Sequence, residues 1–238
     1  LAFASQGAFA ELALAEASRT FAIPDGMAME EAAALPIVYH TSWFALDHRA
    51  KLAPGEWLLV HAGASGVGMS AIQIGLGMGA RVIATAGSEA KRQFAKDLGA
   101  EVVLNYSDAA WVEEVKRITG GRGAHVIYDP VGGDILELST KCIASEGRML
   151  VIGFASGRIP SLAANRALLK NMSLVGVFWG GYVAAHPGYI GETEKNLERL
   201  WMQRKIRPKV GSKFPLSACP QALRSLANRQ VMGKLVLE

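Results

Sequence analysis

The stretch LLVHAGASGVGMSAIQIGLGMGARVIATAGSEAK, residues 58–91, begins as an apolar run, breaks into small residues and resumes as an amphipathic segment. This order predicts a buried strand, a tight turn and a helix, an arrangement that binds nucleotide phosphates. The spacing departs from the usual G-x-G-x-x-G fingerprint, because a serine stands at the middle position. That serine is small enough to keep the approach to the backbone open. The loop residues expected to contact a dinucleotide are Gly63, Ser65, Gly66, Val67 and Gly68.

Short runs rich in β-branched residues alternate with helical patterns from Trp57 onward. The predicted strands are residues 57–62, 81–86, 101–105, 125–130, 148–154 and 173–179. Such alternation predicts crossover connections and a parallel sheet covered on both faces. We therefore expect an α/β fold with a doubly wound, six-stranded parallel Rossmann sheet in the order 3-2-1-4-5-6. Ser88 and Asp108 are expected to cap two of its helices.

The two ends of the chain do not follow this alternation of strands and helices. This difference predicts that the chain is divided into three parts. Residues 54–187 are expected to form the dinucleotide-binding domain, while residues 1–53 and 188–238 form a second lobe that the chain enters early and revisits. The opening segment, with Phe9, Leu12 and Leu14, has the pattern of an extended strand in a sheet. Because the first residue is Leu1 and not Met, we expect the chain to be truncated.

Composition excludes several classes of protein. The 238 residues carry a formal net charge of +4 and offer no run of about 18 apolar residues for a membrane helix. The two cysteines, Cys142 and Cys219, form neither a disulfide framework nor a zinc cluster, so the cytosol (a cytoplasmic protein) is the default expectation. The basic stretch at residues 203–213 is interpreted as a solvated helix end, with a nucleic-acid surface as the less favoured alternative.

The end of the second strand predicts the cofactor. Sites specific for NAD usually carry Asp or Glu there to bind the ribose 2′-hydroxyl. Ala86 occupies that position, and Ser88 and Lys91 follow it where they can bind a 2′-phosphate. Glu89 lies after the turn and is expected to face solvent. NADPH is therefore the predicted cofactor.

With these motifs, the chain resembles the medium-chain dehydrogenase/reductase superfamily, and within it the zinc-free, zeta-crystallin-like quinone oxidoreductases. The resemblance rests on GAFAELALA, AAALPIVYHTSWFAL, GEWLLVHAGASGVG, DLGAEVVLNYSD, VIYDPVGGD, GRMLVIGFASGRIP, SLVGVFWG and GKLVLE. It implies a GroES-like β-rich lobe, of which this chain retains a remainder, joined to a Rossmann domain. In zinc alcohol dehydrogenases a ligand cysteine follows the LP pair, but Ile37 stands there, so no metal is expected.

The resemblance also implies individual contacts with the cofactor. Thr41 resembles the threonine that contacts the nicotinamide, and Tyr106 resembles the tyrosine that holds the adenosine phosphate together with Lys91. Further cofactor-binding residues are expected at the ends of the fifth and sixth strands and in the tail, namely Gly153, Phe154, Ser156, Phe178, Trp179 and Lys234. Tyr39 and His40 are candidate hydrogen-bond donors to the substrate.

These features favour an NADPH-dependent reductase that transfers hydride to a quinone or another electron-poor enone without a metal. An enoyl-thioester reductase is the first alternative, with Arg166 and Lys170 as residues for a coenzyme A group. A cofactor-binding protein with a non-enzymatic or RNA-binding role is the second alternative. The apolar strand SLVGVFW is expected at the sheet edge, where it would pair with a second copy to form a homodimer. His61 is interpreted as a structural histidine.

Overall fold

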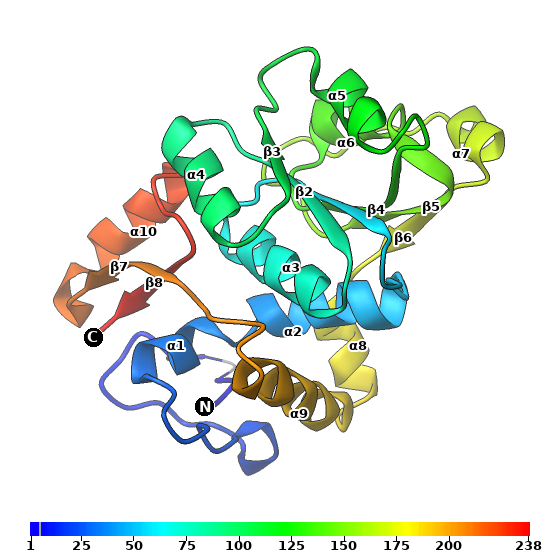
Figure 1. Cartoon of the computed structure of the whole chain (residues 1–238). Helices are drawn as coiled ribbons and strands as arrows, with labels where there is room; N and C mark the ends of the chain where they lie inside the picture. Colours follow the sequence, from blue (N-terminus) through cyan, green and yellow to red (C-terminus); the bar gives the residue numbers. More distant parts are fainter. Residues whose placement is uncertain (5) are drawn as a thin grey trace.

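The computed structural model describes residues 1–4 and 6–238, and its largest element is a six-stranded sheet (Figure 1). The strands are β1 (Trp57–Val60), β2 (Arg81–Thr85), β3 (Val102–Leu104), β4 (Ala124–Asp129), β5 (Ile143–Val151) and β6 (Ser173–Gly176). Their order is β3-β2-β1-β4-β5-β6, and every pairing is parallel. The predicted class and strand order are therefore confirmed.

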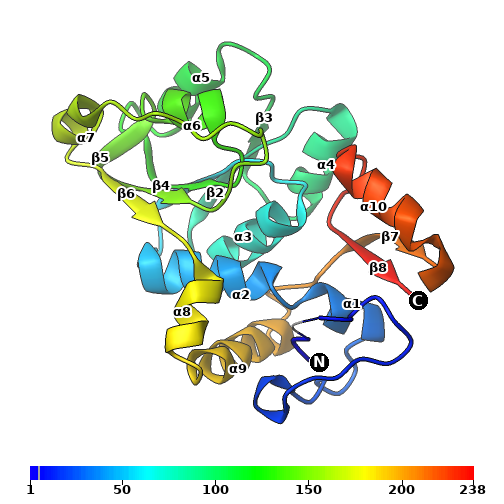
Figure 2. The same ribbon diagram turned by 180° about the vertical axis from the view of Figure 1, so that it is seen from behind.

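Helices cover the two faces of the sheet (Figures 1 and 2). They are α3 (Gly66–Gly77), α4 (Glu89–Asp97), α5 (Trp111–Ile118), α6 (Gly133–Ser139) and α7 (Ala164–Lys170). Alternate residues of β1 serve different cores: Leu58 packs in the cluster that contains α3, and Leu59 packs in the cluster that contains α5 and α6. Burial on both faces explains why β1 is a continuous apolar run and not an alternating one.

Two predicted helix caps have different outcomes. The Ser88 hydroxyl accepts a hydrogen bond from the Lys91 N–H over 3.3 Å and caps α4 as expected. Asp108 does not cap α5, which has Ala110 at its N-cap. The Asp108 carboxylate instead accepts from the Ala110 N–H over 2.9 Å, so it closes a turn that precedes the helix.

The remaining elements come from both ends of the chain. They are η1 (Ala17–Arg19), α1 (Met29–Ala34), α2 (Val38–Trp43), the π-helix η2 (Phe44–Arg49), α8 (Trp179–Ala185), α9 (Tyr189–Met202), β7 (Val210–Phe214), η3 (Leu216–Ala218), α10 (Cys219–Ala227) and β8 (Lys234–Leu237). Helix α2 contacts α9, and α1 contacts the parallel pair of β7 and β8. Figure 1 shows these blue and orange-to-red segments side by side, so late elements of the chain pack against early ones.

The prediction of a strand in the opening segment is wrong. Phe9, Leu12 and Leu14 are exposed, and residues 6–16 contain no strand. A strand needs a neighbour to satisfy its backbone N–H and C=O groups. Among the described residues near this segment, the one β pairing is an isolated antiparallel bridge between Ala2 and Thr20.

The contacts of α8 bear on the expected domain boundary at residue 187. Its Tyr182 packs against Phe44 of η2, with ring centroids 4.8 Å apart, and its Trp179 packs near Phe3. These contacts join α8 to elements from the beginning of the chain, and the position of the domain boundary stays a prediction. Within residues 1–4 and 6–238, no helix is long and apolar enough to cross a membrane.

Candidate dinucleotide site

The loop of residues 61–65 joins the end of β1 to the start of α3. Ser65 is the N-cap residue, and its hydroxyl accepts a hydrogen bond from the Gly68 N–H over 3.1 Å. A Cβ atom on Gly68 would lie 2.2 Å from the Ala62 carbonyl oxygen, so only glycine fits there. The helix N-terminus supplies N–H groups without intrahelical partners and a partial positive charge, which suit a diphosphate.

A cavity of about 470 Å³ opens beside this loop. Its walls follow the carboxyl ends of β1 to β5 and include the segment between α10 and β8. Its lining residues are His61, Ala62, Ala64, Ser65, Gly66, Thr85, Ala86, Gly87, Lys91, Tyr106, Val131, Ile135, Ala155, Ser156, Leu226, Arg229, Val231 and Gly233. This is the edge of a doubly wound sheet where dinucleotides bind.

The end of the cavity beside β2 is basic. Lys91 Nζ donates a hydrogen bond to the Arg229 carbonyl over 2.5 Å, and Arg229 Nη2 donates to the Ala155 carbonyl over 2.7 Å. Tyr106 lies beside them, and the buried Ala86 supplies no carboxylate. None of the described lining residues is Asp or Glu. Two cations without a competing carboxylate suit a phosphate monoester.

Arg229 is the residue that sequence reasoning missed. It follows α10 and has a φ of 57°, in the left-handed region, which directs the chain across the cavity. The sequence offers one hint of this role. Arg229 stands four residues before Gly233 and Lys234, and Lys234 was itself a predicted cofactor-binding residue. The Gly233 N–H donates to the Ala64 carbonyl over 2.8 Å, and this bond attaches the tail to the phosphate loop.

The structure brings five of the sequence-predicted residues into the cavity wall: Ser65, Gly66, Lys91, Tyr106 and Ser156. Gly63 and Gly68 support the loop from behind, because a Cβ on Gly63 would lie 3.0 Å from the Ala84 Cβ. Ser88 is used as the cap of α4. Lys234 adjoins the loop, since a Cβ on Gly66 would lie 2.9 Å from its Cδ, and burial lowers the pKa of Lys234.

Of the residues expected around the nicotinamide, Ser156 lines this cavity, whereas the others do not: Thr41, Gly153, Phe154, Phe178 and Trp179. Val67 lies in the first turn of α3, and its carbonyl accepts from the Ser42 hydroxyl on α2, the helix that also carries Thr41. Phe178 is 79% exposed. The remaining residues of this group lie elsewhere: Gly153 and the half-exposed Phe154 follow β5, while Trp179 packs 5.8 Å from the His40 ring.

The Tyr39 hydroxyl has a hydrogen-bond partner inside the protein, whereas the His40 ring nitrogens lie near a carboxylate but form no hydrogen bond within the described residues. The buried Tyr39 hydroxyl donates to Gln73 Oε1 over 2.7 Å, which joins α2 to α3. The buried His40 has its Nε2 atom 3.2 Å from a Glu194 carboxylate oxygen on α9. The structure thus corrects the hypothesis for Tyr39, because its hydroxyl proton is used in packing between helices.

The cavity floor contains a buried polar group. His61 Nδ1 lies 2.9 Å from Thr85 Oγ1, and His61 Nε2 lies 2.8 Å from Ser139 Oγ. Burial lowers the pKa of His61, and the nearby Asp129 carboxylate partly opposes this shift. The Asp129 carboxylate itself accepts from the N–H groups of Val131 and Gly132, which closes the turn after β4.

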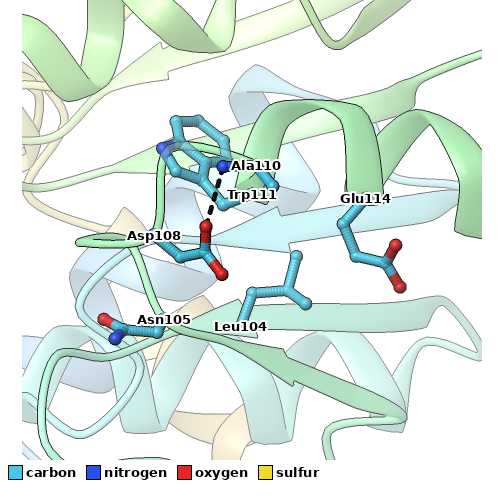
Figure 3. A pocket seen from close by; sticks show the side chains of 6 residues that line it. All are labelled: Leu104, Asn105, Asp108, Ala110, Trp111 and Glu114. Atoms are coloured by element: carbon cyan, nitrogen blue, oxygen red, sulfur yellow. Dashed lines mark hydrogen bonds between the residues drawn. The ribbon is translucent and has the colours of Figure 1, made fainter.

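A smaller cleft of about 180 Å³ lies between β3 and the start of α5. Figure 3 shows Asp108 bonded to the Ala110 N–H there and Glu114 nearby on the helix. Carboxylates at this cleft would repel a phosphate, so we do not assign it to the dinucleotide.

The described residues do not provide a zinc site. Among them no group of three or more His, Cys, Asp or Glu side chains is close enough to hold a metal ion. Ile37 occupies the position where a zinc-ligand cysteine would stand, and its side chain has no lone pair with which to coordinate a metal. A catalytic zinc therefore does not fit the residues that this chain presents, and the absence of a metal stays a prediction.

The basic stretch at residues 203–213 is engaged within the molecule. Lys205 donates to the Gly77 carbonyl, Arg207 stacks 4.3 Å from the Trp201 ring, and Lys213 pairs with Glu30 at 2.6 Å. The expected solvated helix end is thus partly engaged in contacts with α3, α9 and α1, and the role of the stretch stays a prediction.

The doubly wound sheet, the capped loop and the adjoining cavity define a Rossmann-type nucleotide-binding domain. A family model described as zinc-binding dehydrogenase matches residues 66–198. The chain is 37% identical over 229 residues to quinone oxidoreductase-like protein 2 of Bos taurus, a match over 96% of this chain. The chain spans 66% of that relative, just under two thirds of its length.

Two solved structures share this fold. Quinone oxidoreductase of Escherichia coli complexed with NADPH is 30% identical with a TM-score of 0.89, over 98% of this chain and 72% of that one. The CurK enoyl reductase is 30% identical with a TM-score of 0.82, over 93% of this chain and 66% of that one. The chain belongs to the medium-chain dehydrogenase/reductase superfamily, among its quinone oxidoreductase-like members.

Proposed function

We propose that the protein is an NADPH-dependent oxidoreductase that reduces a quinone or another electron-poor enone without a metal. The observation that carries the proposal is the pairing of Lys91 and Arg229 at the end of β2, where Ala86 replaces an acidic residue. The names of the Bos taurus and Escherichia coli relatives support a quinone as acceptor. When bound, a reduced nicotinamide supplies the hydride.

The described residues have separate tasks in this proposal. The first N–H groups of α3 and the Ser65 hydroxyl bind the diphosphate. Lys91 and Arg229 exchange their carbonyl partners for the 2′-phosphate, and Tyr106 closes that end of the cavity. The apolar walls exclude water, which strengthens each of these contacts. Thr41 is proposed to orient the nicotinamide from α2.

An enoyl-thioester reductase is the second candidate. It is favoured by the likeness to the CurK enoyl reductase over 93% of this chain. The same hydride transfer serves both acceptors, because each carries a double bond conjugated to a carbonyl. Arg166 on α7 is the residue that we propose to bind a coenzyme A phosphate.

We also propose a homodimer formed through β6. This strand is the last in the sheet order, so one edge has no strand partner in the described residues. Leu174 on it is half exposed, and Phe178 just beyond it is exposed. Unpaired strand edges with apolar side chains pair readily with another copy. Light scattering checks this proposal, and a monomer at micromolar concentration would rule it out.

The test of function compares two acceptors side by side. NADPH consumption is measured with a small quinone and with an enoyl-coenzyme A thioester, using the intact protein and an Arg166→Ala variant. Faster turnover of the quinone, unchanged by Arg166→Ala, supports the leading proposal. Preference for the thioester, lost in the variant, supports the second candidate. Tight NADPH binding without turnover of either acceptor contradicts both.

A further inference from the structure

Three buried hydroxyl groups join α2, α3 and β4 at one point. The Ser42 Oγ atom on α2 lies 2.7 Å from the Ser70 Oγ atom on α3 and 2.8 Å from the hydroxyl oxygen of Tyr128 on β4. All three side chains are fully buried. Helices α2 and α3 pack against each other (Figures 1 and 2). Ser42 therefore bonds α2 both to α3 and to the sheet.

The proton count gives these hydrogen bonds a direction. Among the residues that the structure describes, the Tyr128 hydroxyl has Ser42 as its only hydrogen-bond partner, and burial raises the pKa of Tyr128. The hydroxyl therefore keeps its proton and donates it, because a buried donor without an acceptor is costly. Ser42 in turn donates to Ser70 and, over 3.3 Å, to the Val67 carbonyl. The Ser70 proton is shared between the carbonyls of Val38 and Val67, each 3.0 Å away.

The network is bonded to the first turns of both helices. Val38 is the first residue of α2, and Val67 lies in the first turn of α3. In the proposed function the first N–H groups of α3 bind the diphosphate, and Thr41, the residue before Ser42, orients the nicotinamide. The hydroxyl network therefore joins the turn proposed for one part of the cofactor to the helix proposed for the other.

A second contact between these helices lies farther from the phosphate loop. Tyr39 on α2 donates to Gln73 on α3 over 2.7 Å, and Gln73 is about two turns beyond Val67 along the helix. With this contact alone, α2 could pivot about Tyr39 and move Thr41 relative to the first turn of α3. A displacement of about 1 Å is enough to slow a reaction about 100-fold.

We propose that Ser42 and Tyr128 are positioning residues that hold Thr41 at a fixed distance from the phosphate loop and so orient the nicotinamide for hydride transfer. This inference rests on the proposed function, because it requires Thr41 to contact the nicotinamide. Neither Ser42 nor Tyr128 lines the cavity, so each acts through the placement of α2. Loss of either hydroxyl should therefore affect the nicotinamide half of the cofactor and spare the adenosine half.

The binding test uses NADPH and adenosine 2′,5′-bisphosphate, which lacks the nicotinamide, with calorimetry as the readout. Ser42→Ala and Tyr128→Phe should weaken NADPH binding by about 3- to 10-fold, the size of one net hydrogen bond. Both variants should bind the bisphosphate as tightly as the intact protein does. The fluorescence emission of bound NADPH should move toward that of free NADPH, because the reduced nicotinamide is held less firmly.

The kinetic test measures hydride transfer in a single turnover, with the acceptor that the intact protein reduces faster. The rate should fall by about 10- to 100-fold in both variants. Tyr39→Phe is the matched control, because it removes the hydroxyl of an equally buried tyrosine whose bond lies away from the phosphate loop. This control should change neither the rate nor the ratio of the two affinities.

The outcomes separate the positioning role from a purely structural one. If Tyr128→Phe and Tyr39→Phe behave alike in the affinity ratio and in the rate, the inference is overturned. If Ser42→Ala does not fold, Tyr128→Phe still decides, because it removes a single oxygen atom. Failure of the intact protein to bind NADPH would overturn the proposed function. Tight NADPH binding that none of the variants changes would overturn the positioning role alone.

Discussion

Lys91 Nζ donates a hydrogen bond to the Arg229 carbonyl over 2.5 Å, although the two residues are 138 positions apart. This bond joins α4 to the segment after α10 across the cavity, and Arg229 continues the contact to the Ala155 carbonyl. Both cations are thus positioned by neutral carbonyls, which a phosphate can replace with a stronger, charge-assisted partner.

Replacement of Lys91 by Ala should therefore weaken NADPH binding more than NADH binding. Loss of a partly exposed, charge-assisted contact predicts about 5- to 50-fold weaker NADPH binding. Dissociation constants for the two cofactors give the ratio. Lys96→Ala on the same helix is the control, because Lys96 donates to the Glu101 carbonyl outside the cavity. Equal loss for both cofactors would contradict a contact with the 2′-phosphate.

Gly68→Ala should destabilise the fold strongly. The added Cβ would lie 2.2 Å from the Ala62 carbonyl oxygen, so strand and helix must move apart. We expect a loss of about 3 kcal/mol in the free energy of unfolding. Gly176→Ala is the matched control, since a Cβ there meets no atom within 4 Å. Chemical denaturation measures both variants, and similar stabilities would refute the close approach.

Tyr39→Phe should lower stability and leave turnover unchanged. The Tyr39 hydroxyl donates to Gln73, whose amide also exchanges two hydrogen bonds with the Arg207 backbone, each 2.9 Å long. We expect a cost of about 1 kcal/mol for Tyr39→Phe and about 2–3 kcal/mol for Gln73→Ala. Denaturation and steady-state kinetics separate the two roles. A fall in kcat at unchanged stability would return Tyr39 to the chemistry.

Because of His61, the free energy of unfolding should decrease as the pH falls below the ordinary histidine pKa. Burial lowers the pKa of His61 in the folded state below the unfolded value of 6.5. Between these two values the unfolded chain binds the proton and the folded chain does not, so the free energy of unfolding decreases as pH falls. Above pH 6.5 this contribution is fully present.

The measurement is the free energy of unfolding as a function of pH, for the intact protein and for His61→Gln. The variant retains hydrogen-bonding capacity but cannot titrate, so its curve should be flatter below pH 6.5. Identical pH dependence in the two proteins would show that His61 is not the group responsible.

The sequence alone determined the sheet and one side of the site. Alternation of apolar strands and helices is a local pattern, and the parallel order follows from the crossovers that it imposes. Ser65 and Lys91 could be expected at the cofactor because each follows a strand end in this scheme, whereas Tyr106 was expected there from the resemblance to the family. The Ser88 cap was equally local, since its partner lies three residues away.

Only the tertiary structure decided the rest. Arg229 reaches Lys91 and Ala155 because the chain returns after α10, and no local pattern encodes that return. The opening segment with Leu12 showed the apolar pattern of a strand, but strand formation depends on a paired neighbour. Asp108 stood at a plausible cap position, yet its carboxylate closed the preceding turn. A local sequence pattern does not specify strand pairing or long-range hydrogen bonds, because both join positions that are far apart in the chain.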